Sequence, residues 1–246
     1  MRNFLFLIVI VFVSCKQNDT SLTAQQIIDK SIIASGANKV ANSNITFDFR
    51  NIQYRASRSE GTFKLSRTFK EDSILIKDEL SNTGFKRFKN DQLSNTIDSM
   101  AVKYSNSVNS VHYFSVLPYG LNDKAVNKKL LKETTIKGKS YYKVQINFSE
   151  DGGGEDFEDV FVYWIQKESF KMDFLAYSFL TDGGGKRFRE LKNVRIINGI
   201  RFLDYNNYKP TNASAKLKDL DKAFESNELI KLSEINLENV KVEILN

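Results

Sequence analysis

Six acidic side chains lie within the ten residues from Glu150 to Asp159, on both sides of a run of three glycines. Carboxylate oxygens are ligands that Ca²⁺ prefers, but their spacing here departs from that of an EF-hand loop. Three cations, Lys186, Arg187 and Arg189, follow a second glycine run further along the chain. We expect the acids to pair with these cations at a solvated rim. Contact with a lipid headgroup or a protein is the alternative, and no metal site is predicted.

The two glycine runs, Asp151-Gly152-Gly153-Gly154 and Asp182-Gly183-Gly184-Gly185, each separate two predicted strands. Consecutive glycines cost chain entropy, so they indicate a local requirement. One interpretation is a pair of hairpin turns that need positive φ. The other is a pair of rim loops that form or gate a mouth at one edge of the sheet. Neither run has the strand–GxxxxGK[ST]–helix context, which excludes a phosphate-binding P-loop.

Side chains for nucleophilic or metal-assisted catalysis are scarce. His112 is the single histidine, and it adjoins the apolar face of a predicted helix, where a packed role is the favoured interpretation. A zinc site built from several histidines or cysteines is impossible, and no GxSxG elbow or Ser-His-Asp set is evident. We predict a protein that is not an enzyme, with no catalytic residues and no cofactor. An enzyme that acts on lipid or glycan through Glu155, Asp156 or Asp182 is the least favoured alternative.

Cys15, the only cysteine, follows a basic start and a short apolar run from Phe4 to Val13. About ten apolar residues are too few to span a bilayer as a helix, and the arrangement is typical of a signal peptide. The stretch Phe12-Val13-Ser14-Cys15 resembles a bacterial lipobox, although leucine is commoner at the position of Phe12. We predict cleavage before Cys15 and acylation of that cysteine. An ordinary signal peptide, or an uncut anchor with an incidental cysteine, is the alternative.

Charge and cysteine usage fit a lipid-anchored protein of the bacterial cell envelope. The formal charge is +6, and removal of residues 1–14 takes away Arg2 alone, which leaves +5. A modest positive charge favours anionic surfaces such as lipid headgroups or serves solubility alone, and we expect no nucleic-acid partner. A single cysteine excludes an internal disulfide, so the fold must depend on its core. Lys16 is not the aspartate that signals inner-membrane retention in some bacteria. It favours the outer membrane and leaves periplasmic or surface exposure open.

Two segments have helical periodicity. Thr23 and Gln26 form a capping-box pattern ahead of an isoleucine stripe, and Gly36 ends it, which predicts a helix over about 24–35. Apolar residues recur at spacings of three and four from Met100 to Ser115, ahead of Pro118 and Gly120. They predict a second helix over about 99–116, inserted between strands and lying across one face of the sheet.

Most other segments alternate with the period of two that is typical of antiparallel strands, and they sum to about ten strands. Asn198-Gly199 between two apolar runs is the strongest hairpin signal, and residues 211–228 are polar and irregular. The predicted strand segments are 44–54 with a bulge near Asn51, 63–69, 74–76, 85–88, 130–136, 142–148, 160–165, 170–179, 188–197, 200–208 and 240–244.

No linker divides the chain, so we predict one domain over residues 23–246, after a signal peptide (1–14) and an acylated tether (15–22). The fold class is α+β, mostly β: a strongly curved antiparallel sheet or unclosed barrel with an N-terminal helix and an inserted covering helix. The 19 phenylalanines and 10 tyrosines either fill the core or line a cavity for an apolar ligand. The residues expected to line such a cavity are Tyr104, Val108, Val111, Phe114, Trp164, Phe174 and Tyr177.

These elements resemble the lipoprotein-carrier (LolA/LolB-like) superfamily, with a first helix that opens Ala24-Gln25-Gln26-Ile27-Ile28-Asp29-Lys30. That resemblance implies an unclosed barrel whose concave face binds acyl chains or other amphiphiles. The chain is more specifically similar to an uncharacterised family of Gram-negative envelope lipoproteins, a domain of unknown function, which implies no known activity. The stretches on which this closer similarity depends are 107–111, 117–121, 152–160, 182–190 and 198–202.

Two functions remain open from the sequence. The leading hypothesis is a lipid-anchored, non-enzymatic envelope protein that holds a hydrophobic or amphiphilic ligand between the concave sheet and the second helix. The alternative is a structural or interaction lipoprotein with a filled core, whose glycine-rich rim loops dock another envelope protein. A cavity of several hundred Å³ behind the second helix would favour the first hypothesis, and a solid aromatic core the second.

Overall fold

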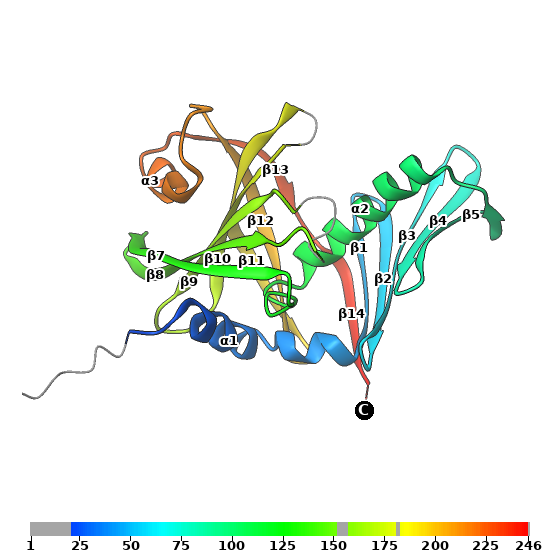
Figure 1. The fold of residues 1–246 in the computed structure, drawn as a ribbon, viewed down its shortest axis with the longest axis horizontal. Helices are drawn as coiled ribbons and strands as arrows, with labels where there is room; N and C mark the ends of the chain where they lie inside the picture. The colour runs from blue at the N-terminus through cyan, green and yellow to red at the C-terminus, as the bar shows by residue number, and fades with distance from the viewer. Residues whose placement is uncertain (1–20, 152–156, 181–182, 246) are drawn as a thin grey trace, which may run out of the picture.

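The structure of the protein is a computed structural model that describes residues 21–151, 157–180 and 183–245. Its strands form two seven-stranded antiparallel sheets, which Figure 1 shows side by side and not closed into one barrel. In spatial order, sheet one contains β14 (Glu238–Ile244), β1 (Ser43–Phe49), β2 (Ile52–Ser59), β3 (Thr62–Glu71), β4 (Ile74–Ser81), β5 (Gly84–Lys89) and β6 (Gln92–Ser94). Sheet two contains β13 (Leu229–Ile235), β12 (Ile200–Pro210), β11 (Gly185–Ile197), β10 (Met172–Phe179), β9 (Val160–Gln166), β8 (Lys139–Phe148) and β7 (Val126–Ile136).

Two-residue turns with positive φ join consecutive antiparallel strands in both sheets. Asn198 and Gly199 have φ values of 48° and 80° and join β11 to β12, which confirms the predicted hairpin. The bulge predicted near Asn51 is wrong. Arg50 and Asn51 have φ values of 50° and 61° and form a two-residue turn, after which Phe49 pairs with Ile52. The change of phase in the sequence therefore marks a hairpin and not an extra residue within one strand.

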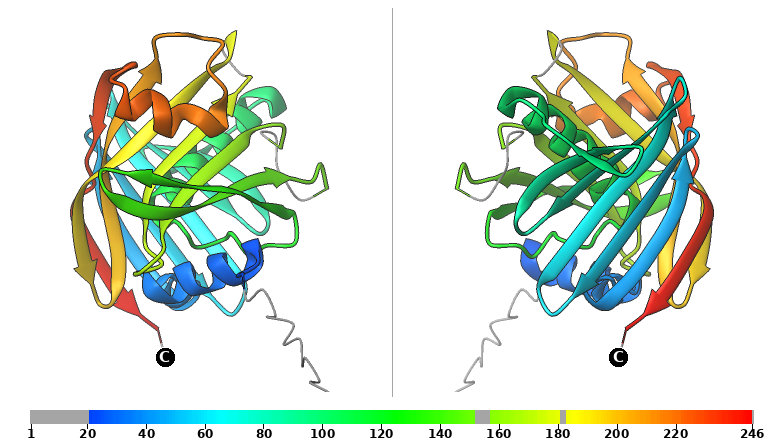
Figure 2. Two further views of the ribbon diagram at one scale, coloured as in Figure 1. Left: turned by 90° about the vertical axis from the view of Figure 1, so that its left-hand side faces the viewer. Right: turned by 90° about the vertical axis from the view of Figure 1, so that its right-hand side faces the viewer.

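Both predicted helices are present, with their ends within two residues of the prediction. Helix α1 (Ala24–Ala34) has the expected capping box, in which the Gln26 backbone N–H donates to the Thr23 hydroxyl and the Thr23 backbone N–H donates to the Gln26 side chain. Gly36 follows it with a φ of 64° and leads into the short helix η1 (Ala37–Asn42). Figure 2 shows α1 and η1 running along one end of the two sheets.

Helix α2 (Asp98–Ser115) lies across sheet one, where it contacts β3, β4 and β5. The placement confirms that the inserted helix covers a sheet face. Among the described residues, none of the helices is both long enough and apolar enough to cross a membrane.

Part of the second half of the chain was not predicted. The segment expected to be irregular contains η3 (Leu217–Asp219) and α3 (Leu220–Glu225), and β13 follows directly. Helix α3 is too short for a clear period, but Leu220 is fully buried and Asp221 forms an ion pair of 2.8 Å with Lys143 of β8. Strand β13 is a sheet edge whose Ile230 and Leu232 are exposed, so it lacks the alternation of a half-buried strand.

The core divides into three clusters, and this division decides which aromatic residues can reach a ligand. One cluster packs sheet one against α2, and a second packs the inner face of sheet two against α1. The third lies on the outer face of sheet two, where Trp164, Phe174 and Phe188 pack against α3. Sheet two is therefore apolar on both faces, because each face has its own covering helix.

Candidate ligand cavity

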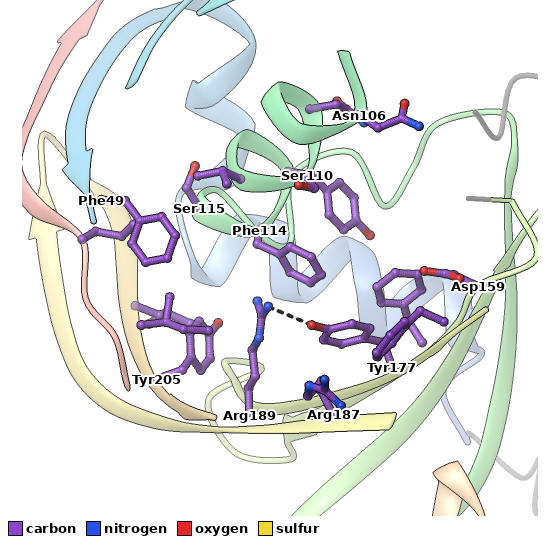
Figure 3. Close-up of a pocket in the computed structure, with 18 of the residues that line it drawn as sticks. Phe49, Asn106, Ser110, Phe114, Ser115, Asp159, Tyr177, Arg187, Arg189 and Tyr205 are labelled. Carbon is purple, nitrogen blue, oxygen red and sulfur yellow. Dashed lines mark hydrogen bonds between the residues drawn. The ribbon is translucent and has the colours of Figure 1, made fainter. Parts of the chain in front are cut away.

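A cavity of about 440 Å³ lies between the C-terminal half of α2 and the inner face of sheet two (Figure 3). Its volume is within the range of about 300–1,000 Å³ that is usual for small-molecule sites. Helix α2 contributes one wall, strands β9 to β12 contribute the opposite wall, and Phe49 of β1 closes one side. The position behind the inserted helix is the one expected from the sequence for a ligand-binding fold.

Aromatic rings in mutual contact form much of the lining. The Phe114 ring of α2 lies 5.4 Å from the Tyr177 ring and 6.1 Å from the Phe161 ring, measured between centroids. Phe161 and Tyr177 stack at 5.7 Å. Because β9 and β10 are neighbours, these two side chains project from one sheet face. The rings give the cavity an apolar wall suited to a hydrocarbon or an aromatic group.

One arginine side chain lies among these rings. Arg189 of β11 is 8% exposed, and its guanidinium lies 4.0 Å from the centroid of the Phe114 ring. Its Nη2 donates to the Tyr177 hydroxyl at 3.1 Å, the bond that Figure 3 marks. Arg187, two residues earlier, also lines the cavity and lies 4.9 Å from the Phe179 ring. The cavity is thus apolar in most of its wall and cationic at one place.

Tyr113 and Tyr205 add hydroxyl groups to the polar part of the lining, and Tyr163 belongs to the adjoining core cluster. The Tyr113 and Tyr163 hydroxyls are 2.9 Å apart and bond to each other. Tyr205 lines the cavity, and its buried hydroxyl has no hydrogen-bond partner. Burial raises the pKa of all three phenols above the ordinary value of 10, so each stays neutral and able to donate at physiological pH.

Six residues singled out from the sequence line this cavity. They are Val111, Phe114 and Tyr177, expected as ligand contacts, Arg187 and Arg189, expected at a rim loop, and Asp159, one of the acids expected to pair with these cations. Tyr104 and Val108 lie on α2 but face sheet one: Tyr104 packs against Phe85 and Arg87, and Val108 is buried in the core beneath the helix. These two residues do not line the cavity.

Trp164 and Phe174 also lie away from the cavity, in the cluster on the outer face of sheet two. Their alternation partners, Tyr163 and Leu175, point to the inner core. Strand periodicity alone places Phe174 and Tyr177 on opposite faces of the sheet. It does not say which face is inner, because both faces are apolar. Cavity residues that the sequence did not single out include Phe49, Phe161 and Tyr205.

The centres of the two glycine loops, Gly152-Gly153-Gly154 with Glu155 and Asp156, and Asp182, lie outside the described residues. Asp151 is exposed in a turn, and Gly183 and Gly184 adopt positive φ, as the hairpin-turn interpretation expects. Ion pairing between the two loops stays a prediction, as does their role as a docking rim. In the part of the chain that the structure describes, no group of three or more His, Cys, Asp or Glu side chains could hold a metal ion.

His112 is packed in the core of sheet one and does not line the cavity. It is 1% exposed, and its ring lies edge-on to Phe47 and Tyr54 at 5.7 and 5.5 Å. Its Nε2 is 3.0 Å from the Ser66 carbonyl oxygen, so Nε2 carries the proton and donates. Burial, with a smaller contribution from the Arg58 cation, lowers the pKa of His112 to about 4.

This lowered pKa predicts a loss of stability in acid. Between pH 6.5 and about 4 the unfolded chain protonates His112 and the folded chain does not, so the free energy of unfolding falls as the pH falls. The expected loss is about 3 kcal/mol, and it levels off below pH 4. Urea unfolding of wild type and His112→Gln between pH 7 and 3.5 measures it, since the variant retains a donor for Ser66 but has no titrating ring. A constant difference between the two proteins across this range would contradict the prediction.

The two sheets, the inserted helix and the cavity beneath it define a protein with a LolA-like fold. A LolA superfamily protein from Nitrosomonas europaea matches with a TM-score of 0.50 and 12% identity, over 92% of this chain and 96% of that one. A DUF1329 family protein from Desulfovibrio piger matches with a TM-score of 0.47 and 9% identity, over 91% and 95% of the two chains. Identities this low show likeness of fold alone.

The family follows from the sequence comparison. The chain belongs to DUF6503, a family of unknown function, whose model matches residues 1–237. A comparison with curated proteins finds no match.

Proposed function

We propose that this protein is a non-enzymatic binding protein of the bacterial cell envelope that holds a hydrophobic or amphiphilic ligand in the cavity under α2. The observation that supports it most is the cavity of about 440 Å³ with its wall of Phe114, Phe161 and Tyr177. The space lies between α2 and sheet two, where a helix packed tightly on the sheet would leave no room for a ligand. The LolA-like fold adds support, since the similar protein from Nitrosomonas europaea belongs to that superfamily.

Filling the cavity should abolish binding. Val111 lines the cavity from α2, so Val111→Trp would place an indole in the space that the ligand needs. We expect co-purifying lipid to disappear from native mass spectra and the affinity for the neutral fluorescent probe N-phenyl-1-naphthylamine to fall at least tenfold. Val102→Trp is the matched control, because Val102 is exposed on the same helix away from the cavity. If both variants are folded and bind the probe with equal affinity, the result contradicts the proposal.

We also propose that residues 1–14 are a lipoprotein signal peptide and that Cys15 carries the acyl chains that attach the protein to the outer membrane. Cys15 lies outside the described residues, so the support is the sequence pattern around it. One acyl chain gives only marginal attachment, and the positive charge of the chain would strengthen it at an anionic surface.

Cys15→Ser should therefore abolish incorporation of radiolabelled palmitate and move the protein from the membrane fraction to the soluble fraction. Ser14→Ala keeps a small residue before the cysteine and should leave labelling and fractionation unchanged. If Cys15→Ser kept both the label and the membrane association, the anchor would have to lie elsewhere in the chain.

A further inference from the structure

Four arginines among the described residues are only 7–8% exposed. Arg87 pairs with Asp78 at 2.6 Å and Arg201 with Asp173 at 3.0 Å, whereas Arg58 and Arg189 have no such ion pair within the described part of the chain. Of these two, Arg189 is the one that lines the cavity. No carboxylate of the described residues pairs with Arg189. Among the described residues, its one side-chain hydrogen bond is to the Tyr177 hydroxyl, and its Nε is buried without a partner. A buried charge is costly unless it is paired, so this site lacks an anion.

A second polar group on the same wall is also unsatisfied. The Tyr205 hydroxyl is buried, lines the cavity and has no hydrogen-bond partner. Figure 3 places Tyr205 and Tyr177 on opposite sides of Arg189, so phenol groups flank the guanidinium. Buried donors without partners are uncommon in folded proteins, and a bound water, ion or ligand group is one explanation for such a donor.

We propose that the ligand carries an anionic head group, a carboxylate or a phosphate monoester, at one end of an apolar chain, and that Arg189 binds this head inside the cavity. The inference rests on the proposed function, because it requires a ligand there. The planar guanidinium has a donor geometry that matches two oxygens of one head group. The Tyr205 hydroxyl supplies a further donor, and the apolar chain lies against Phe114 and Phe161.

The charges around the cavity agree with this orientation. Arg187 lies beside Arg189 on the same strand and adds a second positive charge to the lining. Asp159 also lines the cavity, but Figure 3 places it beyond Tyr177, on the side away from Arg189. The anionic head is therefore expected at Arg189, beside the second cation Arg187.

Calorimetric titration of the full chain with three ligands of equal chain length tests the inference. They are dodecanoate, dodecyl phosphate and the neutral 1-dodecanol, each kept below its micellar concentration. We expect wild type to bind one of the two anions at least tenfold more tightly than the alcohol, and the tighter anion identifies the head group. Arg189→Gln should weaken that anion about tenfold and leave the alcohol unchanged, because a charge-assisted hydrogen bond is lost.

Arg55→Gln is the matched control, since it removes the same charge from an exposed position on β2 and should change nothing. Tyr205→Phe is a second variant, expected to fold as well as wild type and to bind the anion more weakly. Equal wild-type affinities for the anions and the alcohol would overturn the head-group inference while leaving the proposed function intact. Failure to bind any of the three would overturn both.

Discussion

Asp78→Ala should lower the free energy of unfolding by about 3–5 kcal/mol, the usual cost of removing one partner from a buried ion pair. The Asp78 carboxylate is fully buried and accepts hydrogen bonds from two arginines: Arg87 Nε at 2.6 Å and Arg67 Nε at 2.8 Å. Its loss would leave two cations without an anion. It would also loosen α2, because the Arg87 guanidinium lies 3.4 Å from the centroid of the Tyr104 ring on that helix.

Glu79→Ala is the control for Asp78→Ala. Glu79 is the next residue on β4 and pairs with Lys77 at a more exposed position, so its removal should cost at most about 1 kcal/mol. Urea unfolding gives both free energies, and hydrogen exchange along α2 reports the loosening. A loss below about 1 kcal/mol for Asp78→Ala would show that the two arginines find other partners.

Gly36→Ala is the second change with a large expected effect, at least about 3 kcal/mol of lost stability. A Cβ atom at Gly36 would lie 1.8 Å from the Gly199 carbonyl oxygen, far inside van der Waals contact. The atom in the way is backbone of the β11–β12 hairpin, so no side-chain rotation relieves the clash. The φ of 64° adds strain for any residue with a Cβ.

Gly61→Ala separates the clash from the backbone strain. Gly61 has a φ of 77°, but a Cβ there meets nothing within 4 Å. The Gly61→Ala substitution should lower the free energy of unfolding only by the cost of the backbone strain, about 1 kcal/mol. Thermal and urea unfolding of both variants measure the difference, and equal losses would show that the hairpin moves to accommodate a methyl group at Gly36.

The elements with strong local signals were predictable from the sequence. Thr23 with Gln26 gave the start of α1, and Asn198-Gly199 gave the β11–β12 turn, because capping and positive φ depend on adjacent residues. The division into two sheets was not predictable in this way. It depends on pairing between distant segments, such as β1 with β14, for which one sequence holds no local signal.

The candidate cavity was predictable only in part, for a reason specific to sheet two. Alternation assigns Phe174 and Tyr177 to opposite faces, but α3 makes the outer face as apolar as the inner one. Helix α3 was itself missed, so Trp164 and Phe174 were equal candidates with Tyr177. In the sequence, Arg189 is a charge close to a glycine loop. Its place among aromatic rings follows from the pairing of β10 with β11. That pairing sets Arg189 opposite Leu175, two residues from Tyr177, whose hydroxyl accepts its hydrogen bond.

The pairing of β1 with β14 has a consequence for the order of folding. Asn44 on β1 donates to Glu243 on β14 at 2.9 Å, across 199 positions of the chain. Until β14 has been synthesised, β1 keeps one edge unpaired and sheet one is incomplete. Contacts of such long range also slow folding. The nascent chain therefore stays without its finished tertiary structure through most of its synthesis, the condition in which a polypeptide can be threaded through a narrow translocation channel.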